Sequence, residues 1–406
     1  MKTFFRKNKE YLSLMERSNK RKDILLLIMS GILLGISFPP FPFPFTLLMF
    51  IALIPYFYVI EKRTSLAKIN RATYLTFFVF SVITLYWVGS WQKQTDPFLM
   101  IAGGVLLFFN PLLFLIPSTL LYMSRKIFPR NITLFLFPLF WVTYEYLYMI
   151  TDLHFPWLIL GHGLAKFTVF IQAADTIGAV GLSIVVLLIN IFLYKAIVSF
   201  RKKRNKSVYH FSAGLIIFTI FIIYGFYRLS TFKISTKTIR VGVVQPNLNP
   251  WNKWTTNNLS KLTVKYLTLS KKAVEKGAKL IVWPETAYPV FLFDGNYENT
   301  VDSIYSFIQE NNVYLLTGMP DVRFYMNKSK MPPHAVKSVN GNYYYTTYNA
   351  ILLLSPNTRL LQRYAKMKLV PFGERVPFVN QLSFLGSLFK WGVGLSGWNV
   401  GRDTVN

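Results

Sequence analysis

Long apolar runs fill the first half of the chain and end near residue 227. Seven such runs can be drawn, and most approach the roughly 20 residues that a helix needs to cross the hydrocarbon core of a membrane. They lie at 24–38, 43–60, 72–91, 98–123, 132–150, 170–198 and 209–227. The pattern predicts a polytopic α-helical membrane domain with about seven spans, over residues 1–236.

Lysine and arginine gather in alternate connections between these runs. Basic residues precede Asp23 and recur at 61–71, 125–130 and 201–206, whereas the intervening connections carry few of them. Because basic connections stay on the cytoplasmic side, seven spans would place the residues after them outside the cytoplasm. No small-residue cleavage site precedes FPPFPFPF, so we expect the first run to stay as an uncleaved span.

From residue 237 onward, short β-rich runs alternate with stretches of helical periodicity. This alternation predicts an α/β domain over residues 237–406. The expected strands lie at 238–248, 279–285, 313–320, 343–356 and 358–370, and the expected helices at 255–277 and 300–312. The predicted fold is thus a membrane domain followed by a globular α/β domain.

The net charge of +28 suggests nucleic acid as a possible partner, but the basic residues lie mainly beside apolar runs. Membrane topology and anionic lipid headgroups explain them there, so we expect no nucleic acid partner. The chain has no cysteine, which excludes disulfides and thiolate metal sites, and its 4 histidines lack the spacing of metal ligands. No phosphate-binding glycine motif occurs, and the glycines at 386–401 indicate a flexible loop. We therefore expect no metal and no cofactor.

Two acids fall inside apolar runs. Glu145 and Asp175 would be costly in a membrane, which favours either a functional role or hydrogen bonds that pack the helices together. Trp87, Trp91 and Trp157 lie near expected span ends, where tryptophan is typical of the membrane interface.

Glu285 and Lys366 are the candidate chemical residues of the second half. Glu285 directly follows the apolar run LIVWP, so its carboxylate would stand at a sheet edge, where active sites of α/β folds gather. Lys366 follows the run that ends in YA and precedes the motif LVPFGE. On local sequence alone, a turn or capping acid and a surface lysine at a strand end remain open alternatives.

The order of three motifs gives these two residues a common setting. A strand ending in QPN, the WPE of Glu285, and K-x-x-LVPFGE from Lys366 to Glu374 resemble the carbon–nitrogen hydrolase (nitrilase) superfamily. In the first half, the sequences at 38–57, 141–147 and 155–190 resemble bacterial apolipoprotein N-acyltransferases. The resemblance covers nearly the whole chain.

The resemblance implies an integral enzyme of the bacterial inner membrane with an αββα sandwich on the periplasmic side. Such an enzyme moves an acyl chain from a phospholipid to the N-terminal amine of a diacylglyceryl-cysteine on an apolipoprotein, through a thioester and without a cofactor. Its catalytic Glu and Lys match Glu285 and Lys366, and Glu374 matches a supporting acid. Trp254 resembles a tryptophan near the lipid site, and a monomer is expected.

The catalytic cysteine of that family has no counterpart in these 406 residues. We expect a chain truncated before its nucleophile strand, incomplete at its C-terminus and possessing no nucleophile. Ser383, Ser387 and Ser396 are not expected to replace it, because no strand-end elbow surrounds them. Two alternatives remain open: a non-catalytic nitrilase-like membrane protein that binds lipid or lipoprotein, and a polytopic transporter with an external domain, although no internal repeat supports the second.

Overall fold

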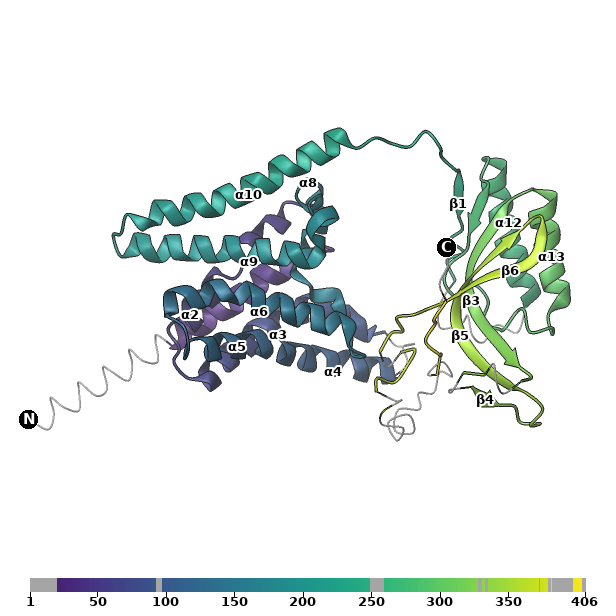
Figure 1. Ribbon diagram of the computed structural model, residues 1–406, viewed down its shortest axis with the longest axis horizontal. Coiled ribbons are helices and arrows are strands. Elements are labelled where there is room, and N and C mark those ends of the chain that lie inside the picture. Colours follow the sequence, from purple (N-terminus) through teal and green to yellow (C-terminus); the bar gives the residue numbers. More distant parts are fainter. Residues whose placement is uncertain are drawn as a thin grey trace, which may run out of the picture. The chain divides into compact units, whose positions relative to one another are not determined.

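The computed structural model describes residues 20–92, 97–248, 259–327, 331–332, 335–371, 373–378, 381 and 397–403. The chain divides into two compact units, Met1–Lys233 and Ile234–Asn406 (Figure 1). The first unit is helical, and the second contains the sheet.

Among the residues of the first unit that the structure describes, five helices are long and apolar enough to cross a membrane. They are Leu66–Gly89 (α3, Leu66–Leu85, and η2, Tyr86–Gly89), Leu99–Ser124 (within α4, Pro97–Leu113, and α5, Leu115–Ser124), Ile132–Ile150 (within α6, Arg130–Ile150), Ala174–Arg201 (α9) and Lys206–Thr231 (α10). The remaining two predicted runs are shorter among the described residues. One is helical over residues 20–36, and the other consists of η1 (Phe45–Phe50) and α2 (Ile54–Ile60).

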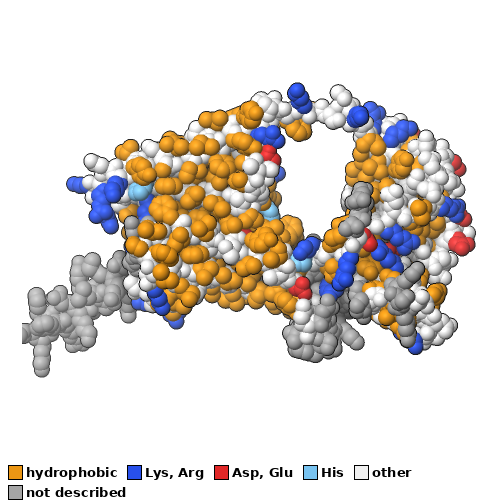
Figure 2. Space-filling view, viewed as in Figure 1, with side chains coloured by type: hydrophobic (Ala, Val, Ile, Leu, Met, Phe, Trp, Pro, Cys, Tyr) orange, Lys and Arg blue, Asp and Glu red, His pale blue; other side chains and the backbone are white. Residues whose placement is uncertain are grey.

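Apolar side chains cover much of the visible surface of this unit (Figure 2). They include exposed residues on α4 and α10, such as Ile101, Val105, Phe108, Ile216 and Ile220. Inside, aromatic rings pack closely, and Phe77 stacks on Phe114 with ring centroids 4.2 Å apart. A helical unit whose exterior is apolar as well as its core suits a lipid environment. The chain is a membrane protein.

The connection between the predicted runs 132–150 and 170–198 contains short helices that contribute to the core. These are η3 (Pro156–Leu158), α7 (Leu160–Gly163) and η4 (Leu164–Lys166), followed by α8 (Thr168–Ile171). Leu158, Leu160 and Leu164 are buried, so this segment is more than an exposed connection. Its apolar composition drives it inward, and its short helices satisfy part of its backbone hydrogen bonding.

Both intramembrane acids have partners that pack the unit. The buried Glu145 accepts hydrogen bonds from Trp141 Nε1 at 2.8 Å and from the Leu160 amide at 2.9 Å, which ties α6 to α7. Asp175 Oδ2 lies 2.6 Å from Arg228 Nε and ties α9 to α10. Of the two roles considered for these acids, the contacts favour helix packing.

In the second unit, the described residues form a mixed sheet of six strands. Its elements are β1 (Val241–Val243), α12 (Leu259–Glu275), β2 (Leu280–Val282), α13 (Glu298–Glu310), β3 (Tyr314–Tyr325), β4 (Val336–Lys337), β5 (Tyr344–Ser355) and β6 (Thr358–Ala365). The strand order is β1-β2-β3-β5-β4, and β6 also pairs with β5. The first three strands pair in parallel, and the later pairs are antiparallel.

The two faces of the sheet differ in character. Helices α12 and α13 cover one face (Figure 1), where Ile281, Leu315 and Leu352 belong to the buried core. Val282 and Ile351 lie at alternate positions and so point to the other face. The described residues thus form one sheet and one helical layer of the αββα sandwich that the resemblance implies.

Neighbouring residues of β5 allow this difference to be tested. Leu352→Ala should lower the free energy of unfolding of the globular unit by about 2–5 kcal/mol, because it leaves a cavity in the core. Ile351→Ala should cost less than about 1 kcal/mol, since that side chain is already 47% exposed while Leu352 is 0% exposed. Urea titration of the detergent-solubilised chain, followed by pulse proteolysis of the globular unit, measures both changes. Equal costs would contradict the assignment of the two faces.

Candidate functional site

A cavity of about 480 Å³ is lined by Val282, Leu316 and Ile351, whose side chains point away from the face of the sheet that packs in the core with the helices. Its walls combine apolar side chains with two groups that can carry charge and face one another, Glu285 and Lys366. The lining consists of Val282, Trp283, Glu285, Leu316, Thr317, Gly318, Asn349, Ala350, Ile351, Tyr364, Lys366, Met367 and Lys368. Strands β2, β3 and β5 and the residues after β6 therefore all contribute to one site.

Glu285 is held where β2 ends against β3. The amide of Trp283 donates to the Leu316 carbonyl at 2.9 Å, and the amide of Ala287 donates to the Gly318 carbonyl at 2.7 Å. A Cβ at Gly318 would lie 2.7 Å from the Glu285 Cα, so this close approach requires glycine. The main chain fixes the base of the Glu285 side chain while 62% of that side chain stays exposed.

Lys366 joins the two acids that sequence motifs single out. Its ammonium lies 3.1 Å from Glu285 Oε1 and 2.8 Å from Glu374 Oε1. Glu374 is itself fixed, because its Oε2 accepts a hydrogen bond from the Val370 amide at 2.7 Å. The structure therefore brings Glu285, which lies 81 residues before Lys366 in the sequence, together with Lys366 and Glu374.

Asn349 completes the cluster and was missed by sequence reasoning. Its Nδ2 donates to Glu285 Oε1 at 2.6 Å and to Glu374 Oε1 at 3.0 Å, and its carbonyl accepts the Lys366 amide at 2.7 Å. The one signal in the sequence is a polar residue that interrupts the apolar strand YNAILLL. Asn349 thus links both carboxylates to the main chain of the lysine.

The carboxylates keep Lys366 charged. Burial is the largest single influence on the pKa of Lys366 and lowers it, but the hydrogen bonds and charges of Glu374 and Glu285 together raise that pKa above its usual value. Lys366 is therefore a cation at neutral pH and suits the stabilisation of negative charge better than proton abstraction.

The remaining sequence predictions for the site fall outside the described residues. Trp254 lies there, as do Ser383, Ser387 and Ser396. Within the part of the chain that the structure describes, no three His, Cys, Asp or Glu side chains group as metal ligands do. Among the described residues, Glu285 and Lys366 meet at a cavity whose other walls are largely apolar.

We expect the pKa of Lys366 to fall in the variant Glu374→Gln. The substitution removes a negative charge 2.8 Å from the ammonium and leaves the lowering effect of burial. Competitive acetylation at a series of pH values, with Lys366 followed by mass spectrometry, measures this pKa. Glu298→Gln, at an exposed position in the first turn of α13, is the matched control and should leave the titration unchanged.

The folding stability of the globular unit should also depend on the protonation of Lys366. Because the folded-state pKa of Lys366 is raised, its stabilising contribution is complete below the unfolded-state pKa of about 10.4 and is lost as pH rises through the folded-state value. Glu374→Gln should weaken this alkaline loss of stability. An unchanged Lys366 titration in Glu374→Gln would show that the two side chains do not interact as described.

Two protein-family models match this chain. The family model "Apolipoprotein N-acyltransferase N-terminal domain" matches residues 30–192, and the model "Carbon-nitrogen hydrolase" matches residues 240–400. The first match falls in the helical unit and the second in the unit that contains the sheet and the cavity.

Curated relatives match across both units. The apolipoprotein N-acyltransferase of Chlorobaculum tepidum is 29% identical over 395 residues, covering 95% of this chain and 71% of the relative. That of Rickettsia prowazekii is 26% identical over 371 residues, covering 90% and 68%. That of Geobacter metallireducens is 30% identical over 400 residues, covering 95% of this chain and 72% of the relative. Because the similarity extends over most of this chain and of its relatives, the chain belongs to the apolipoprotein N-acyltransferase family, whose globular domain is of the nitrilase type.

Proposed function

We propose that the protein serves the N-acylation of bacterial lipoproteins, in which an acyl chain passes from a phospholipid to the N-terminal amine of a diacylglyceryl-cysteine. Family membership supports an acyltransferase that works on lipoproteins at a membrane. The observation that carries the proposal is the Lys366 ammonium between Glu285 and Glu374 at the edge of an apolar cavity. That arrangement combines a cation for a developing oxyanion with an acceptor for a proton.

The cavity suits the hydrocarbon part of such a donor. Val282, Leu316, Ile351 and Met367 contribute apolar walls beside the charged cluster. An acyl chain gains about 0.8 kcal/mol for each methylene that it removes from water. An enzyme whose donor and acceptor both carry acyl chains therefore benefits from membrane attachment, which the five long apolar helices would provide.

Glu285 is proposed as the general base and acid. Its carboxylate is the more exposed of the two that contact Lys366 and lines the cavity. It would take the proton of the attacking thiol, return it to the leaving alcohol, and later take a proton from the incoming amine. Asn349 would hold the carboxylate in place through its 2.6 Å hydrogen bond.

Lys366 is proposed to stabilise the tetrahedral oxyanion. A positioned donor of this kind contributes about 2–4 kcal/mol to transition-state stabilisation. Glu374, whose side chain is only 16% exposed, would orient the ammonium and keep it protonated. We propose Trp254 as a lipid contact by its motif alone.

The nucleophile sets a limit on what these residues can do. The family mechanism passes through a cysteine thioester, and the 406 residues contain no cysteine. We propose that they supply the base, the cation and the lipid cavity, and that the covalent step needs a thiolate that they do not contain. The second candidate function, a non-catalytic protein that binds lipid or lipoprotein, rests on this same observation.

The membrane setting completes the proposal. The basic connections at 61–71, 125–130 and 201–206 support an inner-membrane protein with these segments in the cytoplasm and the globular unit in the periplasm. We propose that it acts as a monomer, because the residues that define the site all lie in one globular unit.

In native membranes, where a thiolate that these 406 residues lack can be supplied, the protein should convert a diacylglyceryl lipopeptide into its N-acylated form when given a phospholipid with an isotopically labelled acyl chain. Glu285→Gln and Lys366→Met should each lower the rate at least about 100-fold, because each removes one element of acid–base or oxyanion catalysis. Glu298→Gln should leave it unchanged. Mass spectrometry of the lipopeptide provides the measurement, and transfer at the normal rate by Glu285→Gln would remove this residue from the mechanism.

The 406-residue chain by itself gives a sharper test of the thiol requirement. We expect it to bind phospholipid but to form no N-acylated lipopeptide, because its sequence has no thiol to carry the acyl group. The same labelled phospholipid and lipopeptide serve as substrates, and the native membranes are the positive control. Acyl transfer by the 406-residue chain would refute the thioester route for this protein.

A further inference from the structure

Residues 397–403 contact both Lys366 and Glu374 through their main chain. The amides of Gly397 and Trp398 each lie 3.3 Å from the Glu374 carbonyl, to which they donate. The amide of Gly401 donates to the Lys366 carbonyl at 2.9 Å. We refer to residues 397–403 as the strap, because they bridge these two members of the site.

The strap is also bound to the sheet. Asn399 donates to the Thr347 carbonyl of β5 twice, from its amide at 2.9 Å and from Nδ2 at 3.2 Å. At Gly401 the two main chains approach so closely that a Cβ would lie 2.0 Å from the Ala365 carbonyl oxygen. This end of the glycine-containing segment is therefore packed against β5 and the end of β6, whereas its composition predicted a flexible loop.

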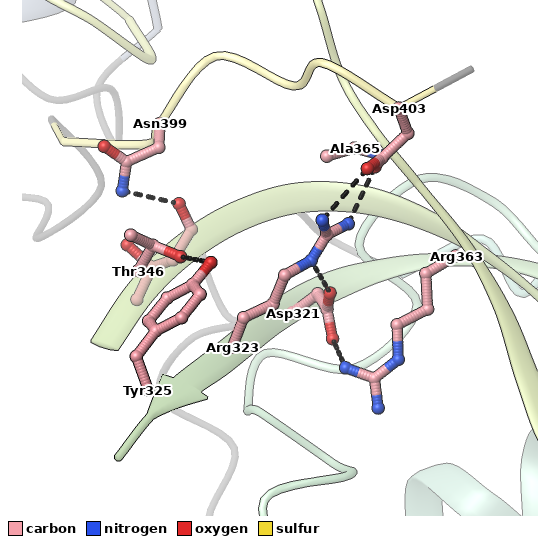
Figure 3. Close-up of polar contacts among 9 residues, drawn as sticks. Asp321, Arg323, Tyr325, Thr346, Arg363, Ala365, Asn399 and Asp403 are labelled. Atoms are coloured by element: carbon pink, nitrogen blue, oxygen red, sulfur yellow. Dashed lines mark hydrogen bonds and ion pairs between the residues drawn. The ribbon is translucent and has the colours of Figure 1, made fainter. Parts of the chain in front are cut away.

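Asp403 fixes the end of the strap through two parallel charged hydrogen bonds. Arg323 Nη1 donates to Asp403 Oδ1 at 2.9 Å and Nη2 donates to Oδ2 at 2.7 Å (Figure 3). Asp403 Oδ2 also accepts the amide of Ala365, the residue before Lys366, at 2.8 Å. The hydrogen bonds from Arg323 hold the pKa of Asp403 below its usual value despite partial burial, so Asp403 is an anion at neutral pH.

The guanidinium of Arg323 is itself held on the sheet. It lies over the ring of Tyr348, 4.7 Å from the centroid, and its Nε is 3.5 Å from the buried Asp321. Asp321 is paired in turn with Arg363 of β6 at 2.7 Å. Two arginines and two aspartates thus form a connected network over β3, β6 and the strap (Figure 3). Such a network restricts its members more than an isolated surface pair does.

Lys366 depends on this network because it stands just past the end of β6. Its amide donates to the Asn349 carbonyl, and its carbonyl accepts from Gly401 of the strap. The residue on its N-terminal side, Ala365, is bonded to Asp403. If the strap moved away, two of these three main-chain restraints would be lost, and the ammonium would be held less closely between Glu285 and Glu374.

We propose that Arg323 and Asp403 are positioning residues that hold Lys366 in the site through the strap. The inference rests on the proposed function for the role of Lys366, but the placement of its ammonium can be measured without any turnover. A failure of the positioning proposal is therefore distinguishable from a failure of the proposed acyl transfer.

Asp403→Asn in the full chain is the primary test, because it removes the charge that pairs with Arg323 and keeps a side chain of nearly the same size. We expect the pKa of Lys366, measured by competitive acetylation and mass spectrometry, to fall by about half a unit, which makes Lys366 about threefold more reactive below that pKa. The exposed Lys271 and Lys276 of the same unit serve as internal references and should not change. Asp302→Asn, which removes an exposed 2.7 Å ion pair with Arg359, is the matched control and should leave Lys366 unchanged.

Conservative variants separate positioning from folding. Arg323→Lys keeps the charge but loses the parallel pair of hydrogen bonds, so it should shift the Lys366 titration by less than Asp403→Asn does. An unchanged Lys366 titration in a folded Asp403→Asn protein would overturn the proposal, and so would an unchanged titration in Arg323→Lys if only that variant folds. Failure of both variants to fold would assign the pair a structural role and would equally overturn it.

Discussion

The ion pairs of Lys366 with Glu285 and Glu374 are the interaction on which the proposed site depends. A lone ammonium in a partly buried position would have a lowered pKa, and two neighbouring carboxylates would repel each other. The ammonium and the two carboxyl groups therefore stabilise one another in this position. Asn349 donates hydrogen bonds to both carboxyl groups from one amide, so a neutral residue completes the arrangement.

The sheet provides the rigidity that this cluster requires. Glu285 is bracketed by hydrogen bonds to β3, Asn349 belongs to β5, and Lys366 directly follows β6. Because β5 pairs with both β3 and β6, one continuous ladder sets the distance between the acid and the lysine. The same ladder points apolar side chains toward the cavity, so apolar walls and the charged side chains lie together at one edge of the sheet.

Sequence reasoning reached the parts of this site that local motifs encode. Glu285 follows a short apolar strand and a proline, and Glu374 ends LVPFGE, so both have a recognisable setting. Asn349 is marked only as a polar residue within an apolar strand, and Arg323 has no such mark, because their roles depend on strand register and on contacts with distant residues. Gly401 shows the same limit: glycine is compatible with flexibility and with close packing, and only the approach of Ala365 decides between them.

The membrane unit shows a related limit of periodicity. Apolar runs located the five long helices, but run length could not distinguish a span from the shorter helices at Phe45–Ile60. Nor could it show that residues near Leu160 enter the core, where the Leu160 amide meets Glu145. Hydrophobicity determines that a segment avoids water, whereas its path depends on hydrogen bonds with other helices.

The most direct test of the account is to locate a bound acyl chain. Membranes that contain the full chain would be supplied with a phospholipid carrying a photoreactive group at the end of one acyl chain, and the crosslinked residues would be mapped by mass spectrometry. The account predicts crosslinks to the apolar walls of the cavity, at Leu316, Ile351 or Met367. Crosslinks confined to the helical unit would contradict the claim that this cavity, beside Glu285 and Lys366, receives the acyl donor.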